Sequence, residues 1–169
     1  VAQAHKLLQV GRNYLEECDD LDDACLLEKY SEAMKFVKTC KQQPKTNGCI
    51  AESKFKTGRT GEKNLPAGGN DYPVAITNKG YSVVFRFHMK GCAGYAPWAI
   101  EDDNCGFVTV DVNGLKGPNI VGKDIFFARI TKDAIEPWPA LADHIAREEM
   151  KEDCDNGTGL YCASLYLTE

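Results

Sequence analysis

The sequence contains no run of about 18 consecutive apolar residues, the length that a helix needs to cross a bilayer. It has little excess charge of either sign, with 20 Lys and Arg against 25 Asp and Glu and a net charge of -5. A broadly basic nucleic-acid-binding protein is therefore not expected. It also has no initiator Met, and Val1 leads directly into helix-like sequence, so we expect a mature or truncated product.

Motifs for catalysis are also missing. The sequence has no Gly-x-Ser-x-Gly turn, no phosphate-binding loop and no His-Glu-x-x-His. The three histidines, His5, His88 and His144, belong to no motif and are interpreted as ordinary surface residues. The acidic runs Glu16–Asp23 and Glu148–Asp155 are interpreted as solvated helix ends. We therefore expect neither enzymatic activity nor a bound cofactor.

What the chain does contain is the composition of a folded protein. Its 169 residues are 43% hydrophobic and 27% charged, which excludes wholesale disorder. A chain of this length suits one domain, here residues 1–169, with a core of its own.

Cysteine is the most informative residue type. An even number of cysteines, with none closer than seven positions apart, favours disulfides over zinc, whose ligands usually include a pair two to four residues apart. Disulfides persist in oxidising compartments, so we expect a periplasmic, surface or extracellular protein; eight reduced cytosolic thiols are the alternative. The cysteines are Cys18, Cys25, Cys40, Cys49, Cys92, Cys105, Cys154 and Cys162.

Eight cysteines allow 105 pairings, and the spacing favours pairing of neighbours without proving it. Three neighbouring pairs enclose short loops rich in turn residues: Cys40 with Cys49, Cys92 with Cys105, and Cys154 with Cys162. Cys18 and Cys25 remain by elimination. Seven residues of continuous helix would separate their Cα atoms by about 10 Å, so this last pair requires a break in the helix.

The first 40 residues are predicted to be helical. Apolar residues at helical spacing indicate an amphipathic helix over residues 1–17 and a second over about 22–37, or else one long helix through Lys38. We expect Leu7, Leu8, Tyr14 and Leu15 to face the sheet strands at Phe85 and Phe87. Residues 41–71 form a long basic connection, either a solvated loop or a functional one.

From Tyr72 the hydrophobic pattern alternates, which indicates strands. Strands are predicted over residues 74–77, 81–90, 107–112 and 124–131, all within an antiparallel sheet spanning 72–131. Residues 132–169 are predicted to hold a helix over 140–152, and an apolar segment, 160–167, that forms a last strand or a docked tail. The predicted class is α+β, with an N-terminal amphipathic spine helix packed on about four antiparallel strands and loops closed by disulfides.

One loop is chemically specific. Asp111, Asn113 and Asp124 offer the oxygen ligands that calcium prefers, but the fifth and twelfth positions of a calcium-binding loop, Leu115 and Gly122, offer none. The alternative is a hairpin loop whose Asp and Asn side chains bond to the local backbone. Both interpretations stay open from the sequence.

The segment Val110–Gly114, with Pro118-Asn119 and Gly122–Phe126, resembles the closing hairpin of bacterial type IV pilin-like proteins. The Cys154 to Cys162 loop resembles their disulfide-closed C-terminal region, and residues 1–40 and 41–71 resemble the soluble half of the spine helix and the loop that follows it. The apolar half of the spine helix, with its cleavage site, is missing here, and eight cysteines exceed the usual number in such proteins.

This resemblance implies a structural subunit that self-assembles into a helical extracellular filament serving adhesion, motility or DNA uptake. Through the missing segment it would meet the inner membrane, a prepilin peptidase and the assembly machinery. Charge segregation suggests pairing of Glu16–Asp23 with Lys41–Lys63 between subunits. Two alternatives remain: a minor pilin or pseudopilin that binds DNA or a secretion partner, and an unrelated secreted disulfide-rich domain such as a toxin or inhibitor.

Overall fold

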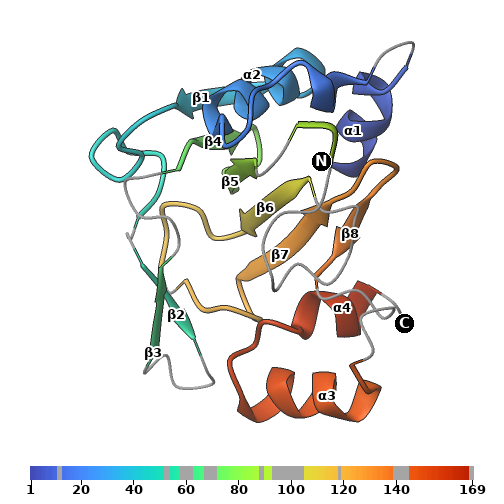
Figure 1. Cartoon of the computed structure of the whole chain (residues 1–169). Coiled ribbons are helices and arrows are strands. Elements are labelled where there is room, and N and C mark those ends of the chain that lie inside the picture. Colours follow the sequence, from blue (N-terminus) through green and yellow to red (C-terminus); the bar gives the residue numbers. More distant parts are fainter. Residues whose placement is uncertain are drawn as a thin grey trace.

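The computed structural model describes residues 1–10, 13–51, 54–57, 63–66, 72–87, 90–92, 105–117, 119–138 and 145–167. A six-stranded antiparallel sheet forms its centre, in the order β1-β4-β5-β6-β7-β8 (Figure 1). Its strands are β1 (Phe36–Cys40), β4 (Val74–Thr77), β5 (Ser82–Phe87), β6 (Gly106–Asp111), β7 (Ile125–Ile130) and β8 (Ile135–Pro137). None of the helices in these ranges is long and apolar enough to cross a membrane.

The predicted spine helix is wrong. Helix α1 (Ala2–Leu8) has only seven residues, and the chain restarts as a 3-10 turn, η1 (Tyr14–Glu16), and then as α2 (Asp23–Ala33). The side chains of Asn13 and Asp22 accept hydrogen bonds from the backbone N–H groups of Leu15 and Cys25, so each caps a new start. The single long helix is therefore excluded, and the helix breaks between Cys18 and Cys25 as their pairing requires.

Residues 1–40 also contain a strand where a helix was predicted. The run from Phe36 to Cys40 is rich in aromatic and β-branched residues, which favour strands, and it pairs with β4. With β8 at the opposite edge, the sheet has six strands rather than about four. Pro137 fits in β8 because an edge strand tolerates proline.

Two further predictions need correction. The connection over 41–71 is not wholly irregular, because β2 (Lys54–Thr57) and β3 (Lys63–Pro66) pair as a two-stranded antiparallel sheet. The apolar segment 160–167 forms helix α4 (Cys162–Leu167) instead of a strand, since a short apolar run carries no periodicity that separates the two. The helix expected over 140–152 is α3 (Arg147–Asn156), and residues 139–144 lie outside the described part of the chain.

Both faces of the sheet carry a hydrophobic core. On one face, Phe85 and Phe87 of β5 pack in a cluster with Leu8, Tyr14 and Leu15, which confirms three of the four predicted packing residues. Leu7 is the exception, at 56% exposed. On the other face, strand residues such as Val74, Val84 and Ile125 pack with the Cys40–Cys49 loop and with Val121. The second cluster fixes the loop after β6, which is where the candidate site lies.

Candidate functional site

Four disulfides join each cysteine to its neighbour in the sequence. The Cα atoms of the pairs lie between 4.3 and 6.2 Å apart, within the range that a disulfide spans. The structure therefore contains the disulfides predicted from the cysteine spacing and leaves no free cysteine among the described residues. The pairs are Cys18–Cys25, Cys40–Cys49, Cys92–Cys105 and Cys154–Cys162.

The loop between β6 and β7 is held by its own side chains. Asp111 is fully buried, and its Oδ1 accepts hydrogen bonds from the backbone N–H groups of Asn113 and Gly114 at 3.0 and 3.1 Å. Asp124 Oδ2 accepts a bond from the N–H of Ile120 at 3.2 Å. The hairpin interpretation of this segment is confirmed. Among the described residues no three His, Cys, Asp or Glu side chains gather as a metal site, and we assign no cation to the loop.

Asn119 closes the same loop from inside. It is completely buried, and its Nδ2 donates to the backbone carbonyl of Gly114 at 3.3 Å. Its Oδ1 has no hydrogen-bond partner among the residues that the structure describes. A buried acceptor left without a partner costs about 1–3 kcal/mol, so the single bond to Gly114 does not satisfy the whole amide.

A second loop, closed by the Cys154–Cys162 disulfide, is organised by Asp153. One oxygen of its carboxylate accepts bonds from the backbone N–H and the hydroxyl of Thr158, at 2.9 and 2.7 Å. The other oxygen accepts from the N–H of Tyr161 at 3.1 Å. A single carboxylate therefore fixes the turn that leads from α3 to α4.

The two loops pack against each other through glycines. A Cβ atom at Gly159 would lie 2.3 Å from the carbonyl oxygen of Val121, and a Cβ atom at Gly122 would lie 2.6 Å from the sulfur of Cys162. Both glycines have positive φ, 78° and 84°, which other residues adopt only with strain. Only glycine allows this approach of the two backbones.

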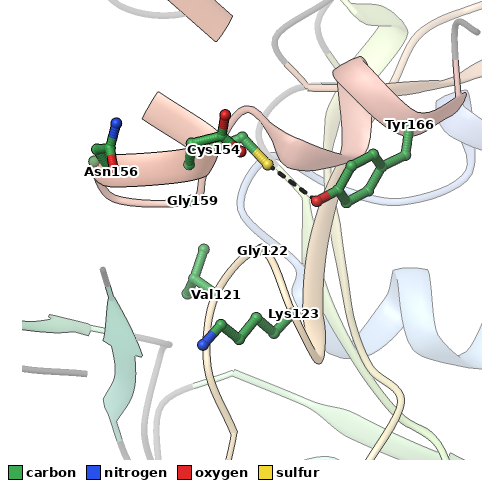
Figure 2. A pocket seen from close by; sticks show the side chains of 9 residues that line it. Val121, Gly122, Lys123, Cys154, Asn156, Gly159 and Tyr166 are labelled. Atoms are coloured by element: carbon green, nitrogen blue, oxygen red, sulfur yellow. Dashed lines mark hydrogen bonds between the residues drawn. The ribbon is translucent and has the colours of Figure 1, made fainter. Parts of the chain in front are cut away.

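A pocket of about 470 Å³ opens at this junction (Figure 2). The hydroxyl of Tyr166 lies 3.3 Å from the sulfur of Cys154, across the mouth of the pocket. The walls are mainly polar and include the charged side chains of Lys123 and Asp155. Such a pocket suits a small polar ligand or a polar side chain of a partner. Its lining residues are Val121, Gly122, Lys123, Cys154, Asp155, Asn156, Gly157, Gly159 and Tyr166.

A second hollow, of about 390 Å³, lies along α3 and is acidic. Burial raises the pKa of the Tyr161 phenol there, and the negative charges of Asp153 and Glu149 raise it further. The tyrosine therefore stays neutral and offers no base. Its ring contacts Trp138 edge to face, with the ring centroids 6.5 Å apart, so it connects the C-terminal region to the sheet.

Some predicted site residues have other roles. His5 is 1% exposed and is not a surface residue, while His88 and His144 lie outside the described part of the chain. The acidic run Glu16–Asp23 is not simply solvated, because Asp20 and Asp23 accept hydrogen bonds from the backbone N–H groups of Lys90 and Phe87. In the basic connection, Lys41 forms an ion pair with Glu28, and much of residues 52–71 falls outside the described ranges.

The pocket itself was not predicted from the sequence. Its two walls are 30 or more positions apart in the chain, and their contact depends on backbone approach at Gly122 and Gly159. The glycines of the segment Asn156–Gly159 are the only local signal of that approach. A scan of protein-family models, a search of curated proteins and a search of solved structures each found no match to this chain.

Proposed function

We propose that this chain is the extracytoplasmic head of a pilus-like filament subunit and acts by assembly, not by catalysis. The observation that carries the proposal is the contact between two segments, the loop of residues 111–124 and the loop closed by Cys154–Cys162. These are the two segments whose residues resemble pilin-like proteins, and glycines at 122 and 159 bring their backbones together. Because the two segments contact each other, they support the resemblance more strongly together than either does alone.

The disulfides support the location that this function requires. Each pair closes a local loop, and such bonds persist in a periplasm or outside a cell. A head exposed on a filament has no chaperones around it, so constraint of its unfolded state is useful there. A disulfide contributes typically about 2–4 kcal/mol in this way.

The proposal has one strict requirement. The described residues among 1–40 contain no long helix, so under this proposal the segment that bundles in the filament core lies before Val1. Through that segment the subunit would enter the inner membrane, meet its peptidase and reach the assembly machinery. The head alone would then form the outer wall of the filament.

The test is to determine the mature N-terminus of the protein from its source cells by mass spectrometry, alongside the coding sequence upstream of Val1. We expect an apolar stretch of about 20 residues, long enough to span a bilayer, to remain in the mature chain. A mature chain that begins close to Val1 after removal of a secretory signal would overturn the filament function. It would favour a free secreted domain instead.

A DNA-binding role remains the second candidate, because the connection between β1 and β4 is basic. Lys54, Lys56 and Lys63 all lie on the β2–β3 hairpin. DNA affinity that falls steeply with salt would support this role, and no binding at low salt would end it. A variant in which Lys54, Lys56 and Lys63 are all changed to Gln tests whether any DNA binding depends on this hairpin or on another part of the chain.

A further inference from the structure

Leu21 combines two unfavourable properties. Its φ of 61° lies in the left-handed region, which is strained for a residue other than glycine. Its side chain is also 59% exposed, so burial does not compensate for the strain. Strain of this kind persists only where the surroundings enforce it, and it is found mainly at functional sites.

The surroundings do enforce it. The Cys18–Cys25 disulfide closes the loop around Leu21, with the Cα atoms of the two cysteines 5.6 Å apart. On either side of the leucine, the Asp20 carboxylate accepts a hydrogen bond from the N–H of Lys90 at 2.7 Å, and the Asp23 carboxylate accepts one from the N–H of Phe87 at 2.5 Å. The leucine is thus presented outward on a fixed loop, which we name the Leu21 loop (residues 18–25).

The exposed charges beside Leu21 are mainly negative. Asp19, Asp20 and Asp22 are all exposed, and Glu16 precedes them on η1. Two exposed cations lie close to the loop: Lys90, which meets Asp20 through its backbone N–H, and Arg86, whose charge acts on Asp23 at the far end of the loop. An apolar side chain inside an acidic rim suits a partner surface with an apolar centre and a basic rim.

The chain itself carries such a surface on β1. Val37 is 64% exposed, and it is the extra residue of a bulge, since Phe36 pairs with Thr77 and Lys38 with Ile76. Lys35 and Lys38 flank it, and both are exposed. β1 is the first strand in the sheet order, so no strand of the described residues covers its outer side (Figure 1).

These two surfaces lie too far apart to meet within one molecule. The Leu21 loop touches Phe87, the last residue of β5, whereas Val37 is level with Ile76, which pairs with Ser82. Five residues of strand correspond to about 17 Å, and β1 lies two strands away from β5. Contact between the surfaces therefore needs a second molecule.

We propose that the Leu21 loop binds the β1 edge of a second copy of this chain, with Leu21 against Val37 and the Asp residues near Lys35 and Lys38. The two surfaces differ, so the contact is head-to-tail and repeats along a row of subunits. The inference rests on the proposed filament function, for which it names the contact between heads. Because the contact is small, it is weak between free heads and is reinforced when the subunits are held in an array.

The experiment measures self-association of the purified chain by sedimentation and NMR line shapes, at low salt and up to about 1 mM, as a small interface requires. In Leu21→Asn the apolar contact is removed, and the backbone conformation is retained because asparagine tolerates positive φ. We expect it to weaken association about tenfold, the loss associated with one buried leucine. Leu115→Asn is the matched control, since Leu115 is 51% exposed and lies outside both surfaces.

A charge exchange identifies the partner surface. Asp19→Lys and Lys35→Glu should each weaken association, and the chain carrying both changes should regain it, because its new charges are again opposite across the contact. Lys79→Glu, on the exposed turn between β4 and β5, makes the same change of charge elsewhere and should have no specific effect. Absence of any association at 1 mM, or failure of the double variant to recover, would overturn the inference.

The two proposals fail separately. A mature chain that begins near Val1 ends the filament function, yet it leaves the association of free heads and its dependence on Leu21 measurable. Conversely, filaments that form normally with Leu21→Asn and with Asp19→Lys would end this inference while leaving the filament function intact.

Discussion

The Nδ1 atom of His5 lies 2.7 Å from the hydroxyl oxygen of Tyr14, and both side chains are buried between α1 and the sheet. The Tyr14 hydroxyl lies 2.9 Å from that of Tyr30 on α2. When the neutral imidazole carries its proton on Nε2, Tyr14 donates to Nδ1 and Tyr30 donates to Tyr14. Protonation of Nδ1 makes it a donor to Tyr14, which removes the acceptor that Tyr14 had in Nδ1.

The first prediction concerns pH. Burial lowers the pKa of His5 below its ordinary 6.5, although the Lys132 carbonyl and the Asp133 carboxylate favour the charged form. The unfolded chain therefore binds more protons than the folded one near this pH, and stability rises with pH. We expect the free energy of unfolding to include the whole contribution of neutral His5 above about pH 6.5. This contribution should be lost as the pH falls below that value.

Chemical denaturation between pH 5 and pH 7.5 measures this dependence. The variant His5→Gln cannot titrate, so its stability should change less with pH than that of the natural chain. Comparison of the two removes the contributions of the other titratable groups, which both proteins share. Equal slopes for both proteins would contradict the role of His5.

The second prediction concerns the packing of α1. Leu8 is 4% exposed in the core, and the adjacent Leu7 is 56% exposed. Leu8→Asp should lower the free energy of unfolding by about 3–5 kcal/mol, because it removes core contacts and buries a charge. Leu7→Asp, the matched control, should change it by no more than about 0.5 kcal/mol. Thermal unfolding distinguishes the two, and similar melting temperatures would show that α1 is not docked.

The third prediction concerns the junction of the two loops. Gly159→Ala should destabilise the chain by more than about 2 kcal/mol, since it adds both strain and a clash with the Val121 carbonyl. Gly80→Ala separates the two effects, because Gly80 has a φ of 82° but open space around it, and should cost about 1 kcal/mol. Gly117→Ala, with neither feature, should be nearly neutral. Denaturant midpoints give the order of the three variants, and a neutral Gly159→Ala would mean that the loops do not touch.

The fourth prediction concerns the hydrogen-bonded hairpin. Asp111→Ala removes the acceptor for the N–H groups of Asn113 and Gly114 and should cost about 2–3 kcal/mol. Calcium or a chelator should leave the melting temperature of the natural chain unchanged. A calcium-dependent rise that is lost in Asp111→Ala would instead restore the cation interpretation of this loop.

Short-range patterns predicted the central antiparallel strands and the disulfides, whereas the predicted spine helix was wrong. The alternation over 81–90 placed Val83, Phe85 and Phe87 on one face of β5, where the structure has them in one cluster. Turn residues between neighbouring cysteines indicated the disulfides. The two edge strands were not predicted. β1 begins only two residues after a helix, so its sequence reads as a continuation of that helix, and β8 has only three residues, too few to show an alternating hydrophobic pattern.

The candidate site was predictable only in part. Asp111 and Asp124 stood out in the sequence, but their role depends on which backbone N–H groups face them, and composition carries no such information. The burial of His5 has no local signal, because its partner Tyr14 is 9 positions away and Tyr30, which bonds to Tyr14, is 25 positions away. Contacts between distant segments decide these roles.

The disulfide pattern has a consequence for how the chain acquires its native form. All four bonds link cysteines only 7 to 13 positions apart. Loops of about ten residues close in roughly 10–100 ns, so each native partner is also the thiol met most often while the chain is still unfolded. Oxidation of the unfolded chain can thus reach the correct pairing out of 105 with little need for reshuffling by an isomerase.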